Sequence, residues 1–249
     1  MKHGLYILTF LTLASCNTTN KIVDGGDWIG YDYSYFCPCY SFSESGTAYE
    51  RLNVLDVNHI SLAPKDYQEA LIKARAYINE RGGASFLQSV SFNYMDITLK
   101  DSINNFKNKR PLYDLEKCGQ TKYYIRFLFN PSKEIKYRFG IALTKNFEII
   151  SKPQFPDIKI STDFSKIISP RTALQKAKNK NKSLIKPVKS IELIYDEKLN
   201  YFIWEIRSKA KTEESPYEFE VGFVKINASS GQFIENGFRK GRILISPSF

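Results

Sequence analysis

The sequence predicts an α+β protein built from two units, each with one helix packed on an antiparallel sheet. The chain has 249 residues, of which 43% are apolar and 25% charged, a balance typical of a folded protein with a buried core. A helical run followed by strand-like runs occupies residues 61–155, and the same order returns in residues 156–249. This repetition favours duplication of one helix-and-sheet unit, although unrelated runs in any α+β chain give the same order.

The first 15 residues are expected to form a signal peptide. A lysine and a histidine precede an apolar run at residues 5–13, which is too short to cross a bilayer and is typical of an exported precursor. The end of this run resembles a bacterial lipobox: Leu13-Ala14-Ser15-Cys16. The resemblance implies cleavage before Cys16 and acylation of its thiol. The alternative is an unlipidated secreted protein in which Cys16 is an incidental thiol.

The expected location is the bacterial cell envelope, with the lipid on Cys16 as membrane anchor. No later apolar run is long enough to predict a membrane helix, and two or three acyl chains suffice for stable attachment. Asn17 stands where an aspartate would resemble an inner-membrane retention signal, so the outer membrane is favoured. Residues 16–30 are polar and contain glycine, as expected of a lipidated tether.

Residues 31–60 form an aromatic N-terminal segment. Tyr31, Tyr33 and Tyr35 alternate with polar residues, which predicts an extended segment with these rings on one side. Such a segment is expected to be an edge strand or a lid over the core. An aromatic platform for a ligand is the alternative.

Three cysteines remain after export, and disulfides persist outside the cytosol. Cys37 and Cys39 flank a proline, so a bridge between them is expected to be strained, and a bridge from Cys118 to either one is easier. A redox or metal motif at Cys37 and Cys39 is the alternative. A metal site would need further ligands at short spacing, and His59 is the only histidine after the signal peptide. We therefore expect neither a metal nor a cofactor.

The first unit is predicted from a spacing of three and four residues between apolar positions. Pro64 suits a first helical turn, and Gly82-Gly83 suits the helix end. The apolar positions of this helix are Tyr67, Ala70, Leu71, Ala74, Tyr77 and Ile78. Antiparallel strands are expected at residues 86–97, 122–129, 135–143 and 147–150.

The second unit repeats this order on a shorter, lysine-rich helix at residues 170–180. Ala173, Leu174 and Ala177 have helical spacing. Strands are expected at residues 188–195, 201–207, 217–226 and 232–235.

The second unit resembles a PepSY domain. The segments that carry the resemblance are ALQKAK in the helix, then SIELIYDEKLNYFIWEIRSK, and the closing hairpin YEFEVGFVKINASSGQFIE. In the hairpin, Asn227 and Gly231 tolerate the positive φ of a tight reversal. The resemblance covers residues 170–249 and extends loosely to residues 61–150. It implies a helix packed across an antiparallel sheet, similar to cystatin-like folds, in a non-catalytic module of extracytoplasmic proteins with an inhibitory or chaperoning role.

Catalysis is not expected. A hydrolytic triad needs a base beside its nucleophile, and His59 is more typical of a loop residue. Common nucleophile, zinc and nucleotide motifs do not occur in the sequence. Glu218 and Glu220 alternate with apolar residues, so we expect them on one solvated strand face. An uncharacterised enzyme with a deep polar pocket is the remaining catalytic hypothesis.

The charge pattern predicts a basic surface. The net charge is +10, and residues 171–189 contain seven cations and no acidic residue: Arg171, Lys176, Lys178, Lys180, Lys182, Lys186 and Lys189. Such a patch attracts an acidic protein, anionic lipid or an anionic glycan. Nucleic acid is not expected in the envelope. The alternative is a solvated helix face that keeps the protein soluble.

The sequence thus favours an envelope lipoprotein that binds or inhibits another envelope protein without catalysis. The alternative function is an assembly or structural accessory protein that binds anionic lipid or glycan through the lysine-rich helix.

Overall fold

The computed structural model describes the parts of the chain that hold both predicted helices. The described residues are 23–25, 39–43, 48–50, 67–98, 120–160, 164, 166–209, 211–212 and 218–242. The predicted signal peptide lies outside them, as do Cys16, Cys37, Cys118, His59, Tyr31, Tyr33 and Tyr35. Cys39 is described by its backbone alone. Within the described part, no helix has the length and apolar character needed to cross a membrane.

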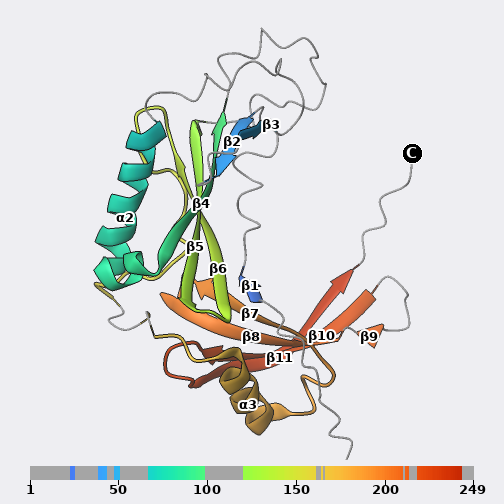
Figure 1. Ribbon diagram of the computed structural model, residues 1–249. Helices are drawn as coiled ribbons and strands as arrows, with labels where there is room; N and C mark the ends of the chain where they lie inside the picture. Colours follow the sequence, from blue (N-terminus) through green and yellow to red (C-terminus); the bar gives the residue numbers. More distant parts are fainter. Residues whose placement is uncertain are drawn as a thin grey trace, which may run out of the picture.

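The α+β prediction is confirmed, because each helix packs on its own antiparallel sheet (Figure 1). In the first unit, α2 (Tyr67–Gln88) precedes β4 (Val90–Thr98), β5 (Tyr123–Ser132) and β6 (Ile135–Leu143). In the second, α3 (Pro170–Asn181) precedes β7 (Val188–Asp196), β8 (Tyr201–Ser208), β10 (Glu218–Asn227) and β11 (Phe233–Arg242). Consecutive strands pair in the order β4-β5-β6 and β7-β8-β10-β11, with the two-residue β9 (Lys211–Thr212) also on β10.

Three short strands extend the first sheet, which runs β1-β6-β5-β4-β2-β3. β1 (Val23–Gly25) pairs in parallel with β6, so part of the predicted tether belongs to the folded body. β2 (Cys39–Ser43) and β3 (Ala48–Glu50) form a hairpin on the outer side of β4. The aromatic N-terminal segment therefore contributes strands to the sheet.

α2 buries the face that its sequence spacing predicts, with Ala70, Ala74 and Ile78 fully buried. It differs from prediction at its end, because the helix kinks at Gly83 (φ 79°) and continues for a short turn to Gln88. Phe86 lies in this turn against Gly82, where a Cβ atom would lie 2.5 Å from its ring. The first strand therefore starts at Val90 and not at residue 86.

α3 begins at a capped N-terminus. The hydroxyl of Ser169 accepts a hydrogen bond from the backbone N–H of Thr172 (3.1 Å), and Pro170 occupies the first turn. Ala173 and Ala177 are fully buried against the second sheet, as their spacing predicts.

Two predicted strands have different lengths in the structure. Residues 147–150 form only an isolated bridge to β6, and Phe147 has φ 64°. By contrast, β11 continues to Arg242, well beyond the predicted end at residue 235.

The two units share one hydrophobic core. Phe202 of β8 is fully buried, and its ring centroid lies 5.5 Å from that of Phe129 and 5.0 Å from that of Tyr137, both in the first unit. Phe86 at the end of α2 is 6.3 Å from the same ring. Aromatic packing at these distances is favourable, so Phe202 joins the two sheets.

We expect Phe202→Ala to lower the free energy of unfolding by about 3–5 kcal/mol, because it opens a cavity between the units. Phe202→Leu should cost less, since it keeps most of the buried volume. Urea unfolding followed by circular dichroism and by tryptophan fluorescence measures the effect. The wild type should give one coincident transition, and two separated transitions would contradict a shared core.

Candidate functional site

α3 exposes all of its cationic side chains. Its apolar side packs through Ala173 and Ala177 toward β8 and β10, and Figure 1 places the helix at the end of the molecule opposite β2 and β3. The seven predicted patch residues are all exposed: Arg171, Lys176, Lys178, Lys180, Lys182, Lys186 and Lys189.

These cations form two groups on the helix and a continuation beyond it. At 100° per residue, Arg171, Lys178 and Lys182 share the line that faces away from the sheet. Lys176 and Lys180 lie on the flank toward β11, where the Lys180 Nζ is 5.5 Å from the Phe233 ring centroid. Lys186 and Lys189 follow on the loop after α3 and at the start of β7. We call the five cations from Arg171 to Lys182 the α3 basic surface.

The α3 basic surface lacks neutralising partners within the described chain. None of its cations forms an ion pair with a described carboxylate. Among the described residues, no neighbouring carboxylate reduces their field, which solvent and salt screen. A concentrated positive potential of this kind raises the local concentration and association rate of anionic partners.

The charges on the opposite face of the second sheet are paired. The two carboxylate oxygens of fully buried Glu205 each accept a 2.8 Å hydrogen bond from Arg239. Arg207 contacts Glu205 and also lies 3.2 Å from Glu192, and Lys225 pairs with Glu235 on the neighbouring strand. These six charges thus neutralise one another, in contrast to the α3 basic surface.

A small open pocket of about 350 Å³ lies at the C-terminal end of α3. Leu184, Ser208 and Gly222 line it, together with Glu220 and the half-exposed ring of Phe238. Glu220 therefore lines this pocket beside the helix exit, where the sequence had suggested an open strand face. The Glu218 side chain lies outside the described residues.

A second polar pair is buried in the first sheet. Asp96 of β4 is fully buried and lies 3.9 Å from Arg126 of β5. The Arg126 guanidinium carbon is 4.5 Å from the centroid of the Tyr94 ring. A buried carboxylate needs a nearby positive charge to offset its loss of hydration. We therefore attribute this pair to the stability of the first sheet.

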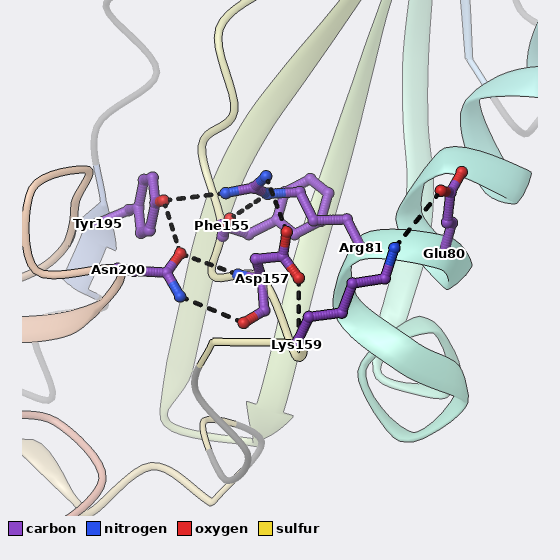
Figure 2. A network of polar contacts seen from close by, with 7 residues as sticks. All are labelled: Glu80, Arg81, Phe155, Asp157, Lys159, Tyr195 and Asn200. Carbon is purple, nitrogen blue, oxygen red and sulfur yellow. Dashed lines mark hydrogen bonds and ion pairs between the residues drawn. The ribbon is translucent and has the colours of Figure 1, made fainter.

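Sequence reasoning missed a polar network at the junction of the units (Figure 2). Arg81 of α2 donates from Nε to the Phe155 carbonyl (2.9 Å) and from Nη2 to the Tyr195 hydroxyl (3.2 Å). Its Nη1 lies 3.5 Å from Asp157. Asn200 accepts from the Asp157 N–H (3.0 Å) and donates to the Asp157 carbonyl (3.2 Å).

The network joins α2, the segment after β6 and the hairpin between β7 and β8. Asn200 has φ 53°, a left-handed conformation that asparagine tolerates, and its Oδ1 also accepts from the Tyr195 hydroxyl (3.2 Å). Lys159 and Glu80 add an exposed ion pair of 3.9 Å at the margin. In the sequence, only the turn residues before Asn200 pointed to part of this network. The other residues could not be linked to it, because they lie far apart in the chain.

Burial at this junction raises tyrosine pKa values. Desolvation raises the pKa of Tyr195, while the hydrogen bond and positive charge of Arg81 partly lower it. Desolvation likewise raises the pKa of Tyr77, again opposed by Arg81. The groups with raised pKa thus include two at the junction, away from the small pocket.

No group of three or more His, Cys, Asp or Glu side chains suited to a metal occurs among the residues with described placement. Cys39 has no described side chain, so the predicted disulfide from Cys118 to Cys37 or Cys39 stays a prediction.

Comparison with known proteins gives no match to a family model, a curated protein or a solved structure. The PepSY resemblance of residues 170–249 therefore stays a prediction.

We expect protein stability to fall as the pH rises above about 10, the ordinary tyrosine pKa. A pKa raised in the folded state gives stability that is fully present below the unfolded value and is lost as the pH rises through the folded value. Tyr195→Phe should flatten this decline, measured by urea unfolding from pH 8 to 11, and the double variant with Tyr77→Phe should flatten it further. An unchanged slope in both variants would contradict the assignment.

Proposed function

We propose that this protein is a lipid-anchored, non-catalytic binding module of the bacterial envelope. In this function, Cys16 holds the module at the membrane, and the α3 basic surface binds an acidic face of another envelope protein. Inhibition of a protease is the form of binding that the PepSY resemblance favours.

The observation that carries this proposal is the difference between the two faces of the second sheet. Six charges on the face away from α3 neutralise one another, including the buried Glu205. The five cations of the α3 basic surface have no described carboxylate partner. Because no described carboxylate pairs with these cations, we assign them to ion pairs with an external partner.

A binding role also agrees with the shape of the second unit. The second unit is one helix packed on a four-strand meander, and α3 lies at one end of the molecule (Figure 1). A protein partner can contact the outward line of Arg171, Lys178 and Lys182 together with the flank of Lys176 and Lys180. Such complementarity mainly increases association rate and specificity, and it depends on ionic strength.

Acylation is tested by changing the anchor residue. We expect the wild-type protein, expressed with its signal peptide in a bacterial host, to enter the membrane fraction, and its N-terminal peptide to carry the mass of a diacylglycerol on Cys16. Cys16→Ala should abolish both results. A wild-type protein with an intact amino terminus and no fatty acid would contradict the proposal.

Binding is tested by reversing the charge of Lys176, Lys178, Lys180 and Lys182 to Glu. We expect the soluble body to retain an envelope protein or to slow a protease in an inhibition panel, and the fourfold variant to lose that binding because attraction becomes repulsion. The effect should weaken as salt rises.

The matched control reverses four exposed cations of the first unit, Lys73, Arg75, Lys133 and Lys145, and produces the same change in net charge. This control should retain binding. Equal loss in both variants would show that only net charge matters, and a wild type that neither retains a protein nor inhibits a protease would remove the proposal.

Binding to anionic lipid is the second candidate, favoured by the absence of any acidic residue from Arg171 to Lys189. The same two variants decide between the functions. If the wild-type body binds phosphatidylglycerol vesicles but no protein, and only the α3 variant loses the vesicles, the accessory lipid-binding function replaces the first.

A further inference from the structure

The second sheet ends in a long strand with one open edge. β11 pairs with β10 along its length, from Arg242 opposite Glu218 to Phe233 opposite Ile226. Among the described residues, no strand pairs with its other edge. An edge strand of ten residues presents a row of backbone donors and acceptors to which another extended chain can bind.

The other sheet edges are less suited to such binding. β1 and β3 have three residues each. β7 is nine residues long, but β1 contacts it. β11 is therefore the longest strand whose outer edge meets no other described strand.

The side of β11 that faces α3 is partly apolar and exposed. Phe233 and Phe238 pair with the inward positions Ile226 and Gly222 of β10, so both rings lie on the face that carries α3. Phe233 is 38% exposed and Phe238 is 55% exposed. The helix thus leaves uncovered the two rings that would lie beside an added strand.

Two lysines that pair with no described carboxylate border the same edge. The Lys180 Nζ lies over the Phe233 ring. A Cβ atom on Gly231, just before β11, would lie 2.6 Å from the Lys176 side chain. Neither lysine has a described carboxylate partner. At the other end of the exposed strip, Phe238 forms one wall of the small pocket.

We propose that the outer edge of β11 binds an extended, acidic segment of a partner protein as an additional strand. This inference rests on the proposed protein-binding function and names the form of the partner. Backbone hydrogen bonds to β11 supply the attachment, Phe233 and Phe238 pack against alternate side chains of the added strand, and its carboxylates pair with Lys176 and Lys180.

Charge makes an acidic partner more suitable than a second copy of this chain. β11 contains three basic residues, Arg239, Lys240 and Arg242, and one acidic residue, Glu235. Arg239 is already paired with Glu205, and Glu235 with Lys225. Two copies pairing edge to edge would, however, bring two α3 helices together, each with Lys176 and Lys180 beside the edge. Repulsion between these lysines disfavours self-association, whereas an acidic segment is attracted to them.

The test measures amide hydrogen exchange of β11 by NMR, with the soluble full-length body after residue 16. The probe is a blocked eight-residue peptide in which Asp and Val take turns at every second position with Thr between them, so that both residue types lie on the face of the added strand that meets Phe233 and the lysines. The control peptide has Lys in place of each Asp. We expect the acidic peptide at millimolar concentration to slow exchange at alternate β11 amides, the ones that point away from β10, and the basic peptide to leave exchange unchanged.

Two variants separate this edge from the rest of the helix. Lys176→Glu with Lys180→Glu should weaken peptide binding about tenfold, the effect of losing two exposed ion pairs. Lys178→Glu with Lys182→Glu makes the same change in charge on the outward line and should weaken binding much less.

Three results would overturn the inference. Changes in the NMR chemical shifts of Lys176 and Lys180 without slowed amide exchange in β11 would show that the peptide is attracted by charge but does not add a strand. If β11 amide exchange slows as the protein concentration rises in the absence of peptide, the edge pairs with a second copy of this chain. No response at millimolar peptide would exclude the site, even if the fourfold variant still lost an envelope protein, because that protein would then bind elsewhere on α3.

Discussion

The burial of Phe202 between the two sheets is the contact on which the arrangement of the molecule depends. Its ring packs on Phe129 and Tyr137 of the first unit while its strand belongs to the second. Because a buried aromatic side chain contributes several kcal/mol, the units cannot separate without a large loss. The position of α3 relative to α2 and β1 is therefore a property of one folded body, even though the chain order indicates two similar units.

The polar network around Arg81 fixes the relative orientation of the two units that pack at this apolar contact. A hydrophobic contact alone tolerates sliding and repacking, whereas hydrogen bonds from one guanidinium to Phe155 and Tyr195 require a defined orientation. Asn200 completes the network through its amide, which binds both backbone groups of Asp157. Phe202 thus contributes apolar stability to the junction, and the hydrogen bonds of Arg81 fix its orientation.

The sequence predicted the features that depend on local periodicity. The spacing of Ala70 and Ala74, and of Ala173 and Ala177, identified the buried faces of both helices, because burial of a helix face follows its 3.6-residue period. The basic patch was predicted from composition, because residues 171–189 contain seven cations and no acidic residue.

The junction and the extent of β11 were not predictable in this way. Arg81 and Tyr195 are 114 positions apart, and nothing in the local sequence around either residue indicates the other. The last seven residues of β11, NGFRKGR, lack an apolar alternation, and the outer edge of the strand meets no described strand. A strand of this kind is defined by its neighbour β10, so only the three-dimensional structure showed the open edge.

The position of β1 links the proposed anchor to the proposed binding surface. β1 pairs with β6 of the first unit and contacts β7 of the second, so the chain enters the folded body at the junction. Only residues 17–22 separate Cys16 from Val23, and a fully extended chain of this length spans about 25 Å. With a lipid on Cys16, the junction would stay within that distance of the bilayer surface.

The sheet order places α3, over β8, β10 and β11, on the same small body. Under the proposed anchoring, a partner that binds both α3 and the β11 edge would have to lie in the membrane or approach it closely, and a short anchor would favour such partners by raising their effective concentration.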